Sequence, residues 1–292
     1  MKKVLSVLLL VLTMLLSACG GEKYEFKDGL MYEDGKAATG TFEFSSDGFK
    51  TKGKFVDGLA EGIFEQYYSD GKLMLKIAFE KGENIKQEVF YRNGNLLLSF
   101  GKNQDKKVYL DNGNLIFVYA DSDDSGEDKV ADENGNVLMT FNLDTKIKDT
   151  YNEKNELLLS YKDGEIFEVG DLDSTENNGI YEFTKDGKLV IKYDSNKEIE
   201  EYFYSTGELM RTTNNNSNET KYFYKNGKSL VTMEDGLEKV TVFSTNGKAL
   251  FEIGEEDSEN GKEAMTEFTV YNEDGKEIFF NFAEVKDIKK ID

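Results

Sequence analysis

The sequence predicts an all-β protein, an elongated antiparallel meander of about ten repeated β-hairpins with helix only in an N-terminal signal peptide. Two observations carry this prediction. Asn-Gly or Asp-Gly pairs recur about every twenty residues, and apolar side chains alternate with polar ones in the segments between them. Asn-Gly and Asp-Gly are strong short-range hairpin signals, because both central residues of a type I′ turn need a positive φ. A period of this length indicates a repeat protein.

The turns align along the chain by their glycine. From Gly187 to Gly247 the glycines are spaced by twenty residues, and elsewhere the spacing is 19 to 23, or 28 and more where polar residues are inserted. The aligned turns are Asp70-Gly71, Asn93-Gly94, Asn112-Gly113, Asn134-Gly135, Asn155, Asp186-Gly187, Thr206-Gly207, Asn226-Gly227, Asn246-Gly247 and Asp274-Gly275. We expect one hairpin per unit, with neighbouring hairpins packed side by side because an isolated hairpin is only marginally stable.

Strands with one buried face are expected after the turns. In five units, positions +2, +4 and +6 from the turn glycine, or from Asn155 in its place, are apolar, whereas the positions between them include serine, threonine and lysine. A strict two-residue alternation places one set of side chains on one face of a strand. The apolar triplets are Leu96/Leu98/Phe100, Leu115/Phe117/Tyr119, Val137/Met139/Phe141, Leu157/Leu159/Tyr161 and Leu189/Ile191/Tyr193.

An aromatic residue precedes most of the turn glycines by three or four positions. Tyr202 and Tyr204 in one unit share their register with Tyr222 and Tyr224 in the next. We expect these tyrosines to stack across neighbouring hairpins as a ladder that packs the sheet. A face that binds sugars or peptides is the alternative.

The N-terminus has the layout of a bacterial lipoprotein signal. Residues 1–18 place two lysines ahead of an apolar run, and the sequence Leu-Ser-Ala that ends this segment is followed by Cys19, the only cysteine. We therefore predict that Cys19 is acylated and holds the chain to a lipid bilayer, in the cell envelope on the non-cytoplasmic side of a bacterial membrane. Residues 19–34 would form the anchor and tether. An ordinary secreted protein with a free thiol is the alternative.

Charge and composition narrow the classes of function. The formal net charge is −21, and it becomes −23 when the two signal lysines are removed. Such a charge disfavours nucleic acid and anionic headgroups, and it favours a basic partner or cations. The chain contains no histidine, which excludes Ser-His, Cys-His and His-metal sites, so we expect a protein that is not an enzyme and has no catalytic residues. A carboxylate pair acting on an envelope glycan is the remaining enzymatic alternative.

One acidic stretch matches the opening of a calcium-binding loop. In residues 121–132, "DSDDSGEDKVAD", the side chains of Asp121, Asp123, Ser125 and Asp132 stand at ligand positions of a twelve-residue loop. Lys129 also falls at a ligand position, and an aspartate replaces the final glutamate. The alternatives are therefore a calcium site, the one cofactor that the sequence suggests, or an acidic insert between hairpins.

Residues 35–82 show a family resemblance. In "GKFVDGLAEGIFEQYYSDGKL", glycines 53, 58 and 62 interleave with Phe55, Phe64 and Tyr67 ahead of an Asp-Gly turn. This pattern resembles bacterial MORN-repeat variants, which are often labelled YwqK-type antitoxins, and the match is good over roughly residues 35–120. The resemblance implies a chain of β-hairpins with a role in interaction or scaffolding, and it implies no catalytic residues.

Together these features predict three segments and one leading function. The segments are a signal peptide (1–18), an anchor and tether (19–34) and a MORN-like hairpin domain (35–292) whose units become atypical, capping units from about residue 240. We expect a membrane-anchored, non-enzymatic platform that binds a protein or an envelope polymer. The alternatives are an antitoxin-like immunity protein that neutralises a basic toxin, and an envelope enzyme acting on glycan.

Overall fold

The computed structural model describes residues 24–46, 49–121, 125–162, 165–234, 239–255, 266–278 and 286–291. It confirms the all-β prediction: these residues form antiparallel hairpins arranged in long sheets, and none of them lies in a helix. It follows that this part of the chain has no helix long and apolar enough to span a membrane. Residues 1–18, where the signal peptide is predicted, lie outside the described ranges.

The first sheet contains 14 strands, and all but one of them follow each other in chain order from β4 to β16. The exception is β27, which lies at the β4 edge. The strands are β4 (Gly40–Ser46), β5 (Phe49–Val56), β6 (Leu59–Tyr67), β7 (Leu73–Glu80), β8 (Glu83–Phe90), β9 (Leu96–Gly101), β10 (Gln104–Tyr109), β11 (Leu115–Tyr119), β12 (Glu127–Ala131), β13 (Val137–Asn142), β14 (Ile147–Tyr151), β15 (Leu157–Lys162), β16 (Glu165–Val169) and β27 (Lys286–Lys290).

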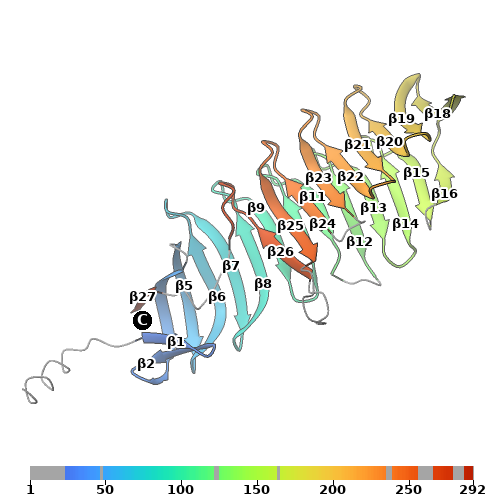
Figure 1. Ribbon diagram of the computed structural model, residues 1–292. Helices are drawn as coiled ribbons and strands as arrows, with labels where there is room; N and C mark the ends of the chain where they lie inside the picture. The colour runs from blue at the N-terminus through green and yellow to red at the C-terminus, as the bar shows by residue number, and fades with distance from the viewer. Residues whose placement is uncertain are drawn as a thin grey trace, which may run out of the picture.

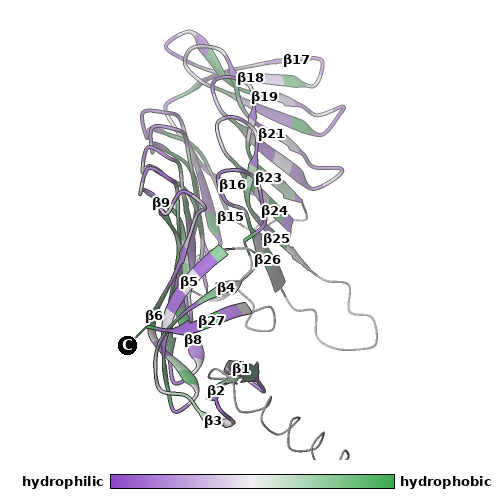
Figure 2. Cartoon of the chain, turned by 90° about the vertical axis from the view of Figure 1, so that its left-hand side faces the viewer, coloured by the Kyte–Doolittle hydropathy of each residue, from purple (hydrophilic) through white to green (hydrophobic). Residues whose placement is uncertain are grey.

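The second sheet contains ten strands, also in chain order. They are β17 (Asp173–Asn177), β18 (Ile180–Lys185), β19 (Lys188–Asp194), β20 (Ile199–Phe203), β21 (Leu209–Asn214), β22 (Glu219–Phe223), β23 (Ser229–Glu234), β24 (Lys239–Phe243), β25 (Ala249–Glu255) and β26 (Thr266–Val270). The chain runs out along the first sheet to β16 and returns along the second, which lies against it as a second layer (Figures 1 and 2). The body is elongated along the direction in which the strands stack (Figure 1).

The reversal of the chain into two sheets buries the apolar faces of the hairpins. Each hairpin has one apolar face, so a single long sheet would expose that face to water along its whole length. In the two-layer body the apolar rows of both sheets face each other and form one cluster of buried residues. Ring contacts join the layers, including Phe100 with Phe268, whose centroids are 4.8 Å apart, and Phe117 with Phe251 at 6.5 Å.

The segment expected to be a tether is partly folded. Strands β1 (Tyr24–Lys27) and β2 (Leu30–Glu33) form a hairpin within it, and β3 (Lys36–Ala37) extends this small sheet to three strands. Met31 is fully buried, and its backbone N–H donates to the carbonyl oxygen of Gly58 at 2.8 Å. The prediction of a tether over residues 19–34 is therefore wrong from Tyr24 onward, because Met31 and its neighbours supply an apolar contact for the first sheet.

Strand β27 closes one edge of the first sheet. It pairs antiparallel with β4, placing Lys286 opposite Ser45 and Lys289 opposite Glu43. This C-terminal strand therefore lies beside N-terminal parts of the chain, and its Lys290 contacts Glu33 of β2 at 2.9 Å. The atypical C-terminal end therefore covers the same end of the body at which the N-terminal hairpin lies (Figure 1).

Most of the repeated turns differ from the predicted type I′, which is found at Asp186-Gly187, where both central residues have a positive φ. Gly227 has a φ of +79°, but Asn226 is not among the residues of positive φ, so this turn is not type I′. The N–H of Gly227 donates to the carbonyl oxygen of Tyr224 at 2.9 Å, and the strand register shifts directly before it. This is a type I turn followed by a glycine bulge, a common alternative for short hairpin loops. Asn155 takes the place of the glycine in its own unit with a φ of +59°, which asparagine tolerates better than most residues.

Candidate functional site

Of the predicted site residues, the structure describes Asp121, Ser125 and Asp132, and it does not bring Asp132 together with the other two. Cys19 and Asp123 lie outside the described residues. Asp121 and Ser125 lie in the connection between β11 and β12, whereas Asp132 comes after β12, a strand of five residues that separates it from them. Because a strand rises by roughly 3.3 Å per residue, Asp132 cannot share one loop with the other two. The prediction of a calcium loop over residues 121–132 is therefore wrong in its geometry.

Asp132 has a structural role. Its carboxylate is fully buried and accepts hydrogen bonds from the backbone N–H groups of Asn134 and Asn136, both at 2.9 Å, and from the side-chain amide of Asn136 at 3.0 Å. Asp121 contacts Lys106 at 3.6 Å. Among the described residues, no group of three or more acidic or cysteine side chains is placed to hold a metal ion.

The tyrosine ladder is confirmed as sheet packing. The side chains of Tyr202, Tyr204, Tyr222 and Tyr224 are at most 1% exposed. The hydroxyl of Tyr224 donates to the carbonyl oxygen of Phe243 in the next hairpin at 2.6 Å, and Tyr204 makes the equivalent bond one unit earlier at 2.8 Å. Each such tyrosine fastens its own turn to the following one, so these rings do not form an exposed binding face.

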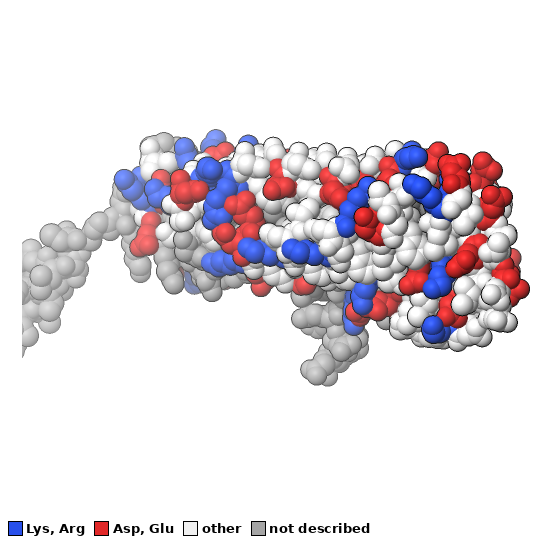
Figure 3. Space-filling model, turned by 90° about the horizontal axis from the view of Figure 1, so that it is seen from above, with Lys and Arg blue, Asp and Glu red and all other residues white. Residues whose placement is uncertain are grey.

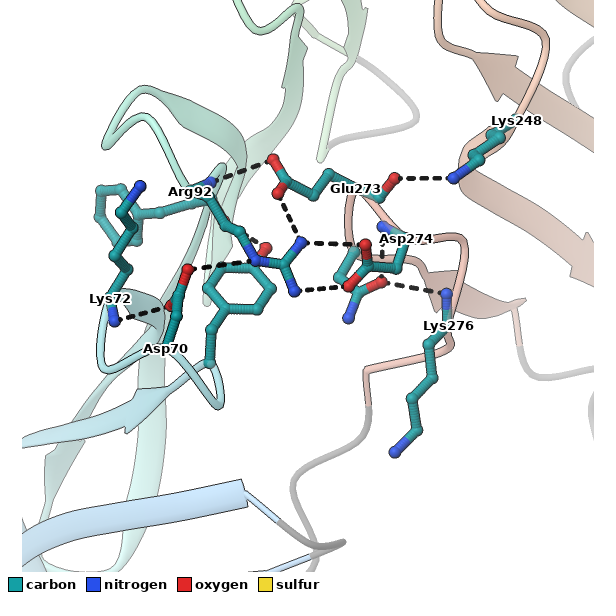
Figure 4. Close-up of polar contacts among 10 residues, drawn as sticks. Asp70, Lys72, Arg92, Lys248, Glu273, Asp274 and Lys276 are labelled. Carbon is teal, nitrogen blue, oxygen red and sulfur yellow. Dashed lines mark hydrogen bonds and ion pairs between the residues drawn. The ribbon is translucent and has the colours of Figure 1, made fainter.

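The turns of the two sheets are also joined by charge. Arg92, in a turn of the first sheet, contacts Glu273 at 2.6 Å and Asp274 at 2.7 Å in the last turn of the second sheet (Figure 4). The paired contact with Asp274 is bidentate, because two guanidinium nitrogens reach its two carboxylate oxygens. The guanidinium also lies 4.3 Å from the ring centroid of Tyr68. These contacts fix the position of the second sheet over the first.

The outer face of the first sheet carries a row of alternating charges. Strand pairing places Lys289, Glu43, Lys52, Glu65, Lys76 and Glu88 side by side on six successive strands. Opposite charges on neighbouring strands stabilise a sheet by a few tenths of a kcal/mol per pair, and a one-residue slip would break the row. This solvated face is therefore explained by strand register and gives no sign of a catalytic carboxylate pair.

A polar cluster interrupts the apolar interior between the sheets. Arg211 is 1% exposed and stands at position +4 of its repeat, where the other units have apolar residues. Its guanidinium donates to the hydroxyl of Thr150 in the facing sheet at 2.9 Å and contacts the carboxylate of Glu200 at 3.3 Å. It also lies over the ring of Tyr202, 4.3 Å from the centroid. The sequence-based prediction did not include Arg211, although a cation at an otherwise apolar position of the repeat indicates a buried charge.

Lys148 belongs to the same cluster. It is paired with Tyr161 on the inner face of the first sheet, and the hydroxyl of Tyr161 lies 3.2 Å from both Glu200 and the hydroxyl of Tyr202. The positive charge of Arg211 and, after it, burial lower the pKa of Lys148 to about 7, while Glu200 acts in the opposite direction. The cluster thus holds two basic side chains and one carboxylate in a mostly apolar layer, which makes it sensitive to protonation.

A cleft of about 400 Å³ lies where the second sheet ends over the first. Its lining is mainly apolar and includes Phe79, Phe100, Phe268 and Val270, with Glu277 as its one ionisable side chain. The lining offers no pair of groups for acid–base chemistry. The cleft therefore gives no support to an enzymatic function.

The two ends of the body differ in charge. Residues 36–110 carry 12 Lys and Arg against 10 Asp and Glu, whereas residues 111–292 carry 20 against 42. Basic side chains gather toward the end where the N-terminal segment begins, and acidic ones toward the opposite end (Figure 3). The polarity follows the long axis, because the second sheet does not extend over the first few hairpins, and β27, which lies beside β4, adds three lysines at that end.

The acidic end is also open and apolar. There, the first sheet ends in β16, whose five residues are all exposed. Ile166 is 54% exposed, Phe167 63% and Val169 46%, and they are joined by Tyr181 of β18 at 40%. Within residues 165–182, which we call the acidic cap, there are six Asp and Glu and no Lys or Arg. This combination of an open edge, exposed apolar side chains and one sign of charge makes the acidic cap the best candidate for a binding surface.

Comparisons with known proteins find only distant likeness. No family model matches this chain, and no curated protein matches it. Among solved structures, the Photorhabdus luminescens Tc holotoxin pore is 12% identical with a TM-score of 0.22, covering 82% of this chain and 18% of that chain. Virginiamycin B lyase from Staphylococcus aureus is 10% identical with a TM-score of 0.22, covering 82% and 74%. This chain thus spans about a fifth of the toxin chain. At these TM-scores neither structure is a guide to function.

Proposed function

We propose that this chain is an exported lipoprotein that is anchored in a bacterial membrane through acylated Cys19. Its MORN-like hairpin body is a non-enzymatic platform that binds a protein or an envelope polymer. The layout of the N-terminal segment supports the anchor, and the resemblance of residues 35–120 to MORN-repeat variants supports the platform.

The observation that carries the proposal is the position of the acidic cap. The first described strand, β1, begins five residues after Cys19, at one end of the body, and the acidic cap lies at the other end (Figure 1). An anchor at the first end would therefore hold the cap away from the bilayer. Anionic headgroups would also repel the acidic end, which keeps it facing outward.

The structure of the body suits a role in which shape matters more than chemistry. Tyrosine hydroxyls fasten consecutive turns, the charge row fixes the register, and Arg92 ties the two sheets together. A stiff repeat body with a distinct end is typical of interaction modules.

The anchor is tested by replacing Cys19. We expect the Cys19→Ala variant to lose fatty-acid labelling and to appear in the soluble fraction, while the wild type is labelled and sediments with membranes. A Ser17→Thr variant serves as a control, because it changes the same segment and keeps the thiol. Persistent labelling of Cys19→Ala would refute the anchor.

A second candidate is an antitoxin-like immunity protein that neutralises a basic toxin in the envelope. The specific observation in its favour is the acidic cap, whose six carboxylates would suit a basic protein. Purification of the protein from its own membranes separates the two candidates. Recovery of a basic toxin whose activity falls on binding supports the second, and recovery of an envelope partner that has no toxic activity supports the first.

A further inference from the structure

We propose that the open edge of β16 binds an extended segment of a partner that alternates Lys or Arg with apolar side chains, and that this segment adds to the first sheet as one more antiparallel strand. This inference rests on the proposed function, because it names the surface and the partner chemistry that the platform would use.

The backbone provides the first step. Within the described residues β16 is the last strand of the first sheet and pairs only with β15, so its other edge presents unpaired N–H and C=O groups. Proteins usually protect such an edge with covering segments, prolines or inward-pointing charge. At the other end of the sheet the last strand is β27, which pairs with β4 and contacts the small N-terminal sheet through Lys290, whereas no described strand lies beyond β16. An incoming strand would satisfy these groups as in other cases of strand addition.

The side chains provide the second step. Ile166 lies opposite Tyr161 and Val169 lies opposite Leu159, so both continue the inner, apolar rows of the first sheet to its end. A register shift between Ser160 and Tyr161 leaves Phe167 as the extra residue of a bulge, 63% exposed. A terminal unit of a repeat array normally carries a polar cap on this side. Here the inner rows end in exposed apolar groups that alternate side chains of an added strand could cover.

The negative charge of the acidic cap favours a basic partner. Glu165 and Glu168 lie on β16 itself, and the whole acidic cap contains no cation. Like charge opposes a second copy that approaches through the same edge. The edge of β27 is basic, but it lies at the end where the N-terminal segment enters, and its Lys290 is already paired with Glu33. A separate basic segment therefore fits the cap better than another copy of this chain.

The test uses three synthetic peptides and the full-length lipoprotein in mild detergent. The first is a fluorescent ten-residue peptide of alternating Lys and Val. The second has Glu in place of Lys, and the third keeps Lys but replaces every second Val by Pro, which removes N–H donors while the charge stays. Fluorescence anisotropy should show binding of the first peptide, and at least about tenfold weaker binding of the other two, because each lacks one of the required interactions.

Matched variants locate the site. The double variant Ile166→Thr/Phe167→Ser should weaken binding of the Lys-Val peptide by about tenfold or more. The control is Ile63→Thr, because Ile63 is also 54% exposed but lies on β6 in the middle of the sheet. It should leave binding unchanged. Circular dichroism and urea unfolding of both variants show that the fold is retained.

Three outcomes would overturn the inference. Equal binding of the Pro-containing peptide would mean that charge alone is responsible, and equal binding by the double variant would place the site elsewhere. Concentration-dependent assembly that the double variant abolishes would assign the edge to a second copy. None of these outcomes affects the labelling of Cys19, so the proposed anchor and platform can stand when this inference fails.

Discussion

Replacement of Lys148 by methionine should stabilise the protein, and by an amount that depends on pH. Methionine keeps the length and the apolar stem of lysine but removes the charge that Arg211 opposes. The ordinary pKa of 10.5 applies to the unfolded chain, and the folded value is about 7. Below pH 7 the lysine is therefore charged in both states, and its charge is unfavourable in the folded one.

The size of the effect follows from the two pKa values. Each unit of pKa difference corresponds to about 1.4 kcal/mol, so the charged lysine destabilises the fold by on the order of 4 kcal/mol at pH 6. Between pH 7 and 10.5 the folded state binds fewer protons than the unfolded state, so the wild-type stability rises with pH. By pH 9 the remaining penalty should be roughly 2 kcal/mol.

Urea unfolding at pH 6, 7, 8 and 9 measures this difference directly. Lys148→Met should exceed the wild type in unfolding free energy at pH 6, and its advantage should shrink steadily up to pH 9. Lys154→Met is the matched control, because Lys154 is exposed in the turn between β14 and β15. This variant should change the unfolding free energy little at every pH. A stability difference for Lys148→Met that stays constant over this range would refute the reasoning.

Three further predictions concern single groups in the body. Burial raises the pKa of Asp128 to about 6, so the stability of the wild type should fall as pH rises from 4 to 6. In urea titrations, Asp128→Asn should be more stable than the wild type at pH 7 by up to about 3 kcal/mol, and this gain should be absent at pH 4. Tyr224→Phe removes the hydrogen bond to the Phe243 carbonyl oxygen and should lower the unfolding free energy by about 1 to 2 kcal/mol; an unchanged urea midpoint would contradict this role. Gly227→Ala has room for a Cβ but keeps a φ of +79°, so it should lower the unfolding free energy by only about 1 kcal/mol. Gly53→Ala would place its Cβ inside the contact distance of the Phe64 ring, so its melting temperature should fall much further than that of Gly227→Ala.

The local features of this fold were predictable because they depend on near neighbours in sequence. Alternation sets the strand faces, and the turn glycines set the hairpins. The choice between a type I′ turn and a type I turn with a bulge was missed, since Asn-Gly fits both. In the observed turns the residue three positions before the glycine, such as Tyr224 or Ser244, forms both backbone hydrogen bonds that close the turn, and its side-chain type varies from unit to unit.

The reversal into two sheets was not predictable from the period. It occurs between β16 and β17, where the N–H of Gly170 donates to the carbonyl oxygen of Leu158. The apolar rows before and after this point have the same alternation, and the long interval between Asn155 and Gly187 indicates an insert without indicating that the chain reverses there. Which rows face each other depends on contacts between residues far apart, such as Thr150 with Arg211.

The calcium prediction failed because two patterns overlap. Asp132 completes an acidic spacing that begins at Asp121, but it also stands three residues before the turn glycine Gly135. Residues at this position close the turns of the array, and the carboxylate of Asp132 does so by accepting backbone N–H groups. The repeat therefore predicts the role of Asp132 better than the shorter acidic motif does.

The contrast between the two ends of the first sheet bears on what the acidic cap is for. Both ends need protection against association through their edges, and the β27 end contacts the small N-terminal sheet through the ion pair of Lys290 with Glu33. At the β16 end, protection comes from the six carboxylates alone, while Phe167 and its apolar neighbours stay exposed. A charge of one sign repels copies of the same chain but attracts a basic segment, and it is neutralised only when such a segment arrives. The same carboxylates can therefore keep the free protein monomeric and choose its partner, which a covering strand could not do.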